Sequence, residues 1–265
     1  SALLFQTVYQ KKNWAGNLFA ICIDGNGDET TCGSTGSEIL WSANQVAENA
    51  GTSWYDTRRI LTMNDNSWTG VPFRWGSISS EQEGWLGTQN VLNYIRGDQS
   101  KEVFNGGSFR SRKDSESDDL FHFADFVHAE PISYAGIILV GGNGGMLHVF
   151  DEDTGEEIFS YIPSFAFKRW DDDSSEYVAK LKTLADTNYE SNHQYFVDQS
   201  VAVQYLDDDS HTMAVGGLGK GGRGVYALNL KGLFSHTDIE DVATAASIVM
   251  WEYPNYARDG LISNN

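Results

Sequence analysis

The chain has 265 residues, with 27 Gly against only 4 Pro, a composition that fits many short strands joined by tight turns. Its formal net charge at pH 7 is −19, and a surface this acidic repels phosphate backbones, so nucleic-acid binding is disfavoured. No apolar stretch approaches the roughly 18–20 residues that cross a bilayer, so no membrane span is expected.

The first predicted elements are two paired strands at 3–9 and 17–23. Because the sequence starts inside this strand-like run, we interpret it as a soluble fragment or processed piece of a longer protein. A short helix at 43–50 follows, with Ser42 as its cap and Gly51 as its stop.

Two cysteines, Cys22 and Cys32, are the whole cysteine content of the chain. A disulfide between them would close a long hairpin and fit a secreted protein, and this is the pairing we expect. The alternative is two free, buried thiols in a cytosolic protein. No other Cys or His lies near enough in sequence to indicate zinc.

Between the cysteines, Asp24, Asn26 and Asp28 have the alternating oxygen-ligand spacing that opens a calcium loop. The remainder departs from that pattern, since Glu29 stands where the loop needs Gly and Thr35 where it needs Glu. Asn26 followed by Gly is also a strong hairpin turn by itself. A calcium site and a disulfide-closed turn both remain open.

Short strands are predicted at 38–41 and 59–62, and then the pattern changes to helical spacing. Apolar residues recur every three or four positions from Ser80 to Gly97, and Ser80 with Glu83 reads as a capping box. We therefore expect a helical insertion near 80–97. The tripeptide Arg96-Gly97-Asp98 at its end, which integrins read on exposed loops, is better explained by Gly97 as the helix stop.

Strands are predicted again from 121 onward. In the first of them, strand alternation places His122 and His128 on one face and Asp125 on the other, which argues against a catalytic triad. Acidic runs at 114–119, 171–173 and 207–209 are interpreted as solvated loop tips. Cation binding is the alternative, because divalent ions relieve the repulsion between neighbouring carboxylates.

The most informative stretch is 140–163, which reads as strand, Gly-rich turn, strand, Asp-Thr-Gly turn, strand. This is the pattern of a β-propeller blade. A second helical insertion is expected near 163–187, interrupted by the acidic run. The later motif Gly217-x-Gly219-x-x-Gly222 matches a dinucleotide fingerprint by letters, but a strand-like segment follows it instead of a helix, so a tight hairpin is predicted and no nucleotide is expected.

Taken together, these patterns predict an all-β, quinoprotein-like β-propeller that occupies residues 1–265 as one partial domain. The strand count supports roughly three to four blades, fewer than a closed ring needs. The predicted propeller is therefore incomplete and carries the two helical insertions.

The sequence of the blade at 140–163 resembles the propeller domain of type IV pilus tip adhesins and assembly factors, the PilC/PilY proteins. Further segments resemble the same family in the same order along the chain. They are 14–20, 93–98, 107–110, 125–131, 195–200, 215–228 and 251–253. The resemblance places this chain in the N-terminal part of the family's C-terminal propeller.

The resemblance implies a non-enzymatic module at the pilus tip outside the bacterial cell. Such a module supports pilus assembly together with minor pilins, and attachment to host or abiotic surfaces, with twitching motility as a possible consequence. It also implies that calcium modulates the propeller, although the family's usual calcium loop belongs to a later blade beyond Asn265.

Two other functions are weighed against this one. A quinoprotein dehydrogenase shares the Asp151-x-x-Thr154-Gly155 turn, but those enzymes often carry adjacent cysteines, and only one good copy of the repeat is present, so no pyrroloquinoline quinone is expected. A carbohydrate-binding propeller would use exposed Trp54, Trp68 or Trp75 as stacking platforms.

Overall fold

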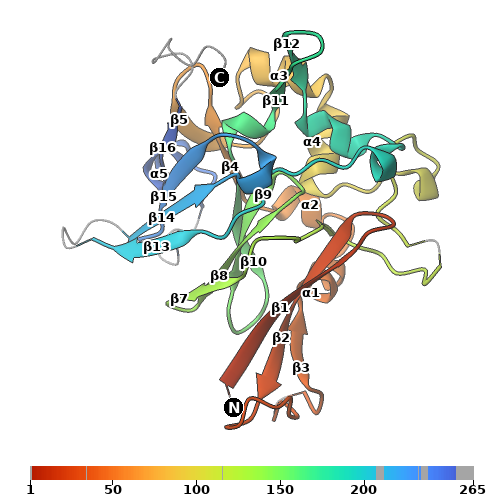
Figure 1. Cartoon of the computed structure of the whole chain (residues 1–265), viewed down its shortest axis with the longest axis vertical. Coiled ribbons are helices and arrows are strands. Elements are labelled where there is room, and N and C mark those ends of the chain that lie inside the picture. The colour runs from red at the N-terminus through yellow and green to blue at the C-terminus, as the bar shows by residue number, and fades with distance from the viewer. Residues whose placement is uncertain are drawn as a thin grey trace.

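The computed structural model describes residues 2–33, 35–114, 116–206, 212–231, 233 and 238–254. Within these ranges the protein is mostly β-structure, with three large sheets, a two-stranded hairpin and short helices placed around them (Figure 1). The acidic run at 207–209 lies outside the described residues.

The N-terminal sheet is built on a long antiparallel hairpin that extends away from the other sheets (Figure 1). Its second strand also pairs with a third strand and with a two-residue strand from much later in the chain. The helix that follows begins at the predicted cap, because the Ser42 side chain accepts a hydrogen bond from the Gln45 amide. The elements are β1 (Ala2–Gln10), β2 (Ala15–Ile23), β3 (Ile39–Ser42), α1 (Ala43–Asn49) and β6 (Phe123–Ala124).

The middle sheet has six strands in the order β5-β4-β10-β9-β8-β7. Three of them, β8, β9 and β10, come from the segment predicted as a blade, and the Gly-rich and Asp-Thr-Gly turns fall between these strands as expected. The pairing of β4 with β10 is parallel and every other pairing in this sheet is antiparallel. The strands are β4 (Ile60–Asn64), β5 (Thr69–Pro72), β7 (Ile132–Tyr134), β8 (Ile137–Gly142), β9 (Met146–Asp151) and β10 (Glu157–Ile162).

The C-terminal sheet is a four-stranded antiparallel meander, β13-β14-β15-β16. A helix not expected from the sequence, α5 (Val242–Ile248), precedes its last strand, and Asp241 caps it by accepting hydrogen bonds from the Ala243 and Thr244 amides. The strands are β13 (Ala202–Tyr205), β14 (Thr212–Gly217), β15 (Val225–Asn229) and β16 (Val249–Tyr253).

The middle sheet is buried on both faces. Along β8, Ile137 and Leu139 belong to the core shared with the C-terminal sheet, whereas Ile138 and Val140 belong to the core shared with the N-terminal sheet. Successive side chains of a strand point to opposite faces. A continuous apolar run is therefore what a strand between two other sheets requires.

The first helical insertion is present as a helix pair, with a third short helix before it. The capping box is one residue earlier than predicted: Ser79 caps α3 and Gln82, rather than Glu83, returns the hydrogen bond. The pair breaks at Gly87, whose φ of 82° suits glycine. The helices are α2 (Trp54–Thr57), α3 (Ser80–Leu86) and α4 (Gln89–Arg96).

The prediction of a second helical insertion near 163–187 was wrong in its secondary structure. The segment forms a two-stranded hairpin, β11 (Lys168–Asp171) with β12 (Glu176–Ala179), between the 3₁₀ turns η2 (Ser164–Ala166) and η3 (Leu181–Ala185). The acidic run makes the hairpin turn, because the Asp171 carboxylate accepts the Ser174 amide. Leu181 and Leu184 are buried, whereas Tyr177 is exposed.

Within the described residues the three sheets do not close on one another into a ring, so the molecule is an incomplete propeller with few helices, as the sequence predicted. The strand counts of four, six and four differ from uniform four-stranded blades. The excess comes from the β4–β5 hairpin, which adds to the middle sheet beside β10.

The glycine-rich segment after β14 is a turn and not a phosphate cradle. Gly219–Gly221 forms a single 3₁₀ turn, η5, and the chain then enters β15, which pairs with β14. The segment lies so close to its neighbour that a Cβ added at Gly221 would meet the carbonyl oxygen of Phe196 at 1.6 Å. Glycine is needed there for close packing of backbone on backbone.

We predict that Gly221→Ala lowers the free energy of unfolding by about 3 kcal/mol or more, because the backbone of 195–197 must move to admit the methyl group. Gly84→Ala is the matched control, since a Cβ at Gly84 in α3 meets nothing within 4 Å. That control should stabilise the protein by about 0.5–1 kcal/mol through helix propensity. Urea unfolding of both variants measures the two effects, and equal stabilities would contradict the packing argument.

Candidate functional site

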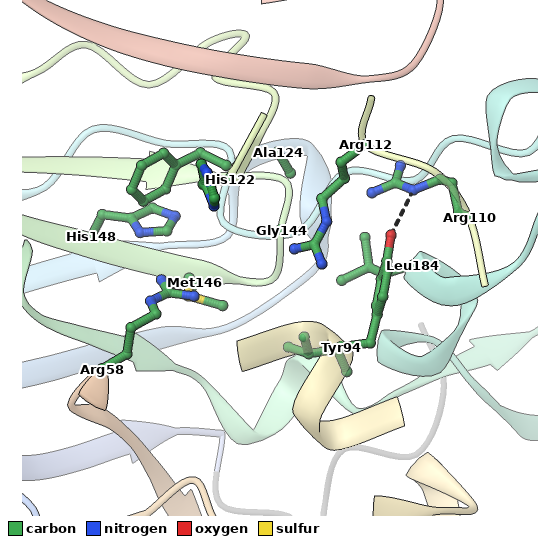
Figure 2. A pocket seen from close by; sticks show the side chains of 12 residues that line it. Arg58, Tyr94, Arg110, Arg112, His122, Ala124, Gly144, Met146, His148 and Leu184 are labelled. Atoms are coloured by element: carbon green, nitrogen blue, oxygen red, sulfur yellow. Dashed lines mark hydrogen bonds between the residues drawn. The ribbon is translucent and has the colours of Figure 1, made fainter. Parts of the chain in front are cut away.

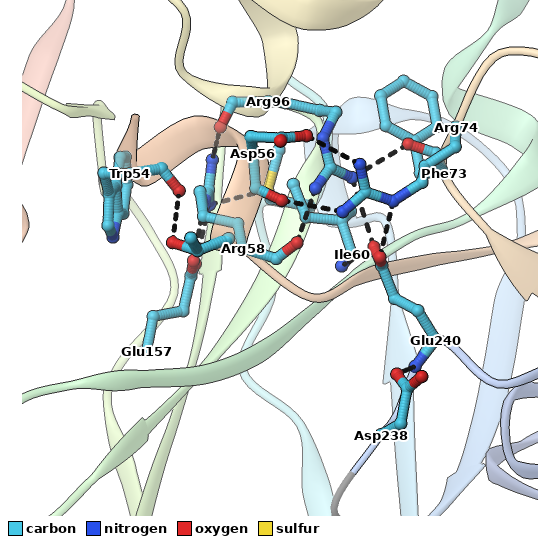
Figure 3. A network of polar contacts seen from close by, with 12 residues as sticks. Trp54, Asp56, Arg58, Ile60, Phe73, Arg74, Arg96, Glu157, Asp238 and Glu240 are labelled. Carbon is cyan, nitrogen blue, oxygen red and sulfur yellow. Dashed lines mark hydrogen bonds and ion pairs between the residues drawn. The ribbon is translucent and has the colours of Figure 1, made fainter. Parts of the chain in front are cut away.

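A buried ion pair joins the end of α2 to the start of β10 (Figure 3). Arg58 donates from Nε to Glu157 at 2.5 Å and from Nη2 at 2.7 Å, and both side chains are almost inaccessible to solvent. The guanidinium also lies 4.4 Å from the ring centroid of Trp54. Burial acts to raise the pKa of Glu157, but the charge of Arg58 and hydrogen bonds from His148 and Arg58 hold it well below its usual range.

A second buried arginine extends this network toward β5. Arg96, at the end of α4, donates to the carbonyl oxygens of Phe73 at 3.0 Å and Arg58 at 2.5 Å, and lies 3.3 Å from Glu240 (Figure 3). Burial lowers the pKa of Arg96 to about 10. Because Arg96 is 1% exposed, the tripeptide Arg96-Gly97-Asp98 is not displayed as a recognition loop, in agreement with its interpretation as a helix stop.

Ser160, His148 and Glu157 lie together but do not have the geometry of a catalytic triad. The Ser160 hydroxyl is 3.2 Å from His148 Nδ1, and Glu157 is 2.7 Å from that same nitrogen. In a triad the serine and the acid contact opposite nitrogens of the ring. Ser160 is also completely buried. The group is therefore structural, and burial lowers the pKa of His148, which keeps the ring neutral and able to donate to Glu157.

A cavity of about 30 Å³ lies next to this group, between β9, α4 and the segment that leads to β6 (Figure 2). Its wall carries five nitrogen-rich side chains and no carboxylate: Arg58, Arg110, Arg112, His122 and His148. A volume of this size holds a few water-sized groups, whereas pockets for cofactors such as a quinone are about 300 Å³ or larger. Its chemistry suits a small anion and disfavours a cation.

A second polar cluster, here called the aspartate network, comprises Asp125, Asn143, Asp198, His128 and His193. Asp125 is completely buried and accepts hydrogen bonds from His193 Nε2 at 3.0 Å and from the Asn143 amide group at 2.7 Å. Asp198 accepts from His128 Nδ1 at 2.6 Å. The Asn143 side chain contacts both aspartates and also accepts the Phe196 amide.

The aspartate network brings together residues from several of the segments that resemble the family. Four of its five residues come from the segments 125–131, 140–163 and 195–200, and His193 lies just before the last of these. Two further segments reach the network through Trp14, which stacks on His193 at 3.6 Å, and Lys220, which lies 3.1 Å from His128. The predicted strand around His122 and Asp125 is reduced to the two residues of β6, so strand alternation does not set the positions of these side chains. His122, His128 and Asp125 nevertheless have different partners, which are Glu48, Asp198 and His193. The sequence alone did not identify this network, because its partners lie tens of residues apart and no local pattern links them.

Glu252, from the segment 251–253, links β16 to the end of β10. It accepts hydrogen bonds from the Tyr161 hydroxyl at 2.6 Å and the Ser164 amide at 2.7 Å, and also contacts the Ser164 hydroxyl. Burial raises the pKa of Glu252 to about 7, although the hydrogen bonds from Ser164 and Tyr161 oppose that rise.

The hairpin loop after β2 is closed by a disulfide between Cys22 and Cys32. Within the loop, Asp24 Oδ1 accepts the backbone amides of Asn26 at 2.8 Å and Asp28 at 3.1 Å, so this carboxylate already organises a turn. Its Oδ2 contacts only the Asn26 amide group, at 3.5 Å. Calcium binding by Asp24, Asn26 and Asp28 stays a prediction.

The other residues that the sequence suggested as cation or sugar sites have ordinary structural surroundings. Asp114 caps its own turn by accepting the Glu116 and Ser117 amides. In the part of the chain that the structure describes, no group of three or more His, Cys, Asp or Glu side chains could hold a metal. Trp54 is buried, and Trp68 and Trp75 pack partly buried against the cores, so these three are poor platforms for a sugar.

Comparison with known proteins identifies relatives for most of the chain. A family model described as the PilY1 beta-propeller domain matches residues 116–259. The chain is 30% identical over 283 residues to the type IV pilus biogenesis factor PilY1 of Pseudomonas aeruginosa strain UCBPP-PA14, with 91% of this chain and 21% of that protein covered. It is 28% identical over 256 residues to a PilY1 homolog of Xylella fastidiosa strain Temecula1, with 86% and 18% covered.

The chain therefore spans about a fifth of the length of the curated relatives it matches. No solved structure matches it significantly. The family match includes the aspartate network and Glu252, whereas Arg58, Arg110 and the disulfide loop precede it.

We predict that Glu252→Gln changes the pH dependence of stability. The folded pKa of about 7 lies above the unfolded value near 4.5, so stability from the protonated acid is complete below about pH 4.5 and is lost as pH rises through about 7. Between about pH 5 and pH 8 the variant should gain up to about 3 kcal/mol relative to the parent. Thermal melts at both pH values measure this, with exposed Glu176→Gln as control; a pH-independent difference would contradict it.

We also predict that calcium raises the melting temperature of the parent protein and that Asp24→Ala removes this rise, because the substitution deletes a proposed oxygen ligand. Asp153→Ala, in the exposed turn after β9, is the control for loss of one surface carboxylate. An unchanged parent melting curve on addition of a calcium chelator would leave this loop as a disulfide-closed turn only.

Proposed function

This chain belongs to the PilY1 β-propeller family, and from that premise we propose that it is a non-enzymatic, cell-surface module of a type IV pilus tip adhesin and assembly factor. The observation that carries the proposal is the family match over 116–259, which contains the aspartate network and the Glu252 contact that joins the middle and C-terminal sheets. The curated relatives are named as type IV pilus biogenesis factors.

The proposed module acts by binding and not by catalysis. The triad-like group around Ser160 is buried and has the wrong geometry, and the arginine-lined cavity is far smaller than a quinone cofactor. The disulfide joins Cys22, near the end of β2, to Cys32 in the loop that follows, whereas the cavity lies between β9 and α4. These features support a scaffold that presents its surface to partners.

The proposed location is outside the cell, at the pilus tip, after passage through the periplasm. The disulfide between Cys22 and Cys32 is of the kind that forms and persists in such an oxidising compartment. Among the described residues, none of the helices has the length and apolar character needed to cross a membrane. The proposed partners are the minor pilins of the tip together with a host or abiotic surface.

We predict that deleting the gene in its own bacterium reduces surface pili several-fold, and that the wild-type gene restores them. Pilin sheared from the surface, compared with total pilin, measures assembly. Asp125→Ala in the full-length protein should restore pili poorly, because it leaves His193 and Asn143 without their buried acceptor. Asp153→Ala is the matched control, since Asp153 is exposed.

Attachment of cells to a surface, measured at equal numbers of pili, separates adhesion from assembly. Unchanged pili and unchanged attachment in the deletion strain would overturn the proposed function. Alcohol-dependent dye reduction by the purified protein, accompanied by cofactor absorbance, would instead support a quinoprotein dehydrogenase.

A further inference from the structure

The arginine-lined cavity contains one cation whose charge has no dedicated partner. Arg58 is paired with Glu157, and Arg112 is paired with Glu102, which it contacts from Nε and Nη2 at 2.7 Å each. Arg110 is 7% exposed, and within the described residues no ion pair to a carboxylate neutralises it. Its Nε donates to the Tyr94 hydroxyl at 3.1 Å, and its guanidinium lies 4.3 Å from the ring centroid of Tyr189.

Two polar atoms of the cavity wall also lack hydrogen-bond partners. Arg110 Nη1 is buried and has none in the described structure, and neither has Nδ1 of His122, whose Nε2 is engaged by Glu48. Figure 2 shows Arg110 and Arg112 on one side of the cavity with Arg58 and His148 across from them. Asp125 acts on Arg110 through its charge, but its oxygens are occupied by His193 and Asn143.

An unpaired buried cation costs several kcal/mol unless an anion or strong acceptor accompanies it. Attraction between charges is also stronger in a protein interior than in water. The cavity volume of about 30 Å³ holds a few water-sized groups and is too small for a larger organic acid. Size and charge together select a monatomic anion over an organic acid.

We propose that this cavity binds a single halide ion, chloride under ordinary conditions, with Arg110 Nη1 as its principal donor. The guanidinium groups of Arg112, on the same side as Arg110, and of Arg58, on the other side, add favourable positive charge. His122 does not act as a donor while its ring is neutral, because Nε2 then carries the proton that binds Glu48, and burial lowers the pKa of His122.

The ion has a route to solvent. Arg110 also lines an open surface cleft of about 350 Å³, whose wall includes Lys12 and Lys113 together with Asp114 and Glu190. Since the same side chain borders both spaces, we expect movement of Arg110 to connect the cavity with the cleft. The bound halide is therefore expected to exchange with halide in solution.

The test compares the chain in sodium chloride and in sodium gluconate at equal ionic strength. Chloride should raise the melting temperature by several degrees, because a ligand that binds only the folded state stabilises it. Arg110→Gln should abolish this difference. Arg169→Gln should retain it, because Arg169 is an exposed arginine paired with Asp171 on β11.

Crystals of the parent protein grown in bromide provide a readout that does not depend on the variants. We expect an anomalous peak within hydrogen-bonding distance of Arg110 Nη1. Ordered water without anomalous signal in the cavity, or equal melting temperatures in the two salts, would overturn the proposal. So would a chloride effect that persists in a folded Arg110→Gln protein, since it would place the ion elsewhere.

Discussion

The burial of the middle sheet on both faces is the constraint on which the rest of the structure depends. Its strands must supply apolar side chains to two different cores, so β8 and β9 contain almost no polar positions, with His148 as the exception. The side chains on the two faces of these strands hold the neighbouring sheets in place. The helices, the hairpin β11–β12 and the disulfide loop are then attached around this centre.

Polar groups in such an interior are tolerated only when they are satisfied. His148, Glu157 and Arg58 meet this condition together, because each bonds to another member of the group. The network joins the neighbouring strands β9 and β10 to the end of α2, which is far from them in sequence. A purely apolar replacement could be equally stable, so we interpret the network as one that fixes which strands become neighbours.

The parts of the fold that depend on local sequence were predictable. The blade at 140–163, the cap at Ser42 and the glycine stops all follow from turn and helix chemistry over a few residues. The segment 163–187 was mistaken for helix because Leu181 and Leu184 have helical spacing, while the turn formed by Asp171 and its neighbours was read as an interruption. The aspartate network, Glu252 and the lining of the cavity could not be predicted, because their partners lie tens of residues apart and only the fold brings them together.

The parallel pairing of β4 with β10 has a consequence for the order of folding. Thr62 and Ile162 lie 100 residues apart in sequence, yet the Thr62 hydroxyl donates to the Ile162 carbonyl at 2.7 Å. Closing so long a loop lowers the chain entropy before the new contacts can compensate for that loss. Such pairings therefore form late. While the polypeptide is being synthesised, β4 can pair with β5, but the edge of β4 that pairs with β10 remains open until β10 has emerged. A chaperone that shields apolar strand edges would be most useful during that interval.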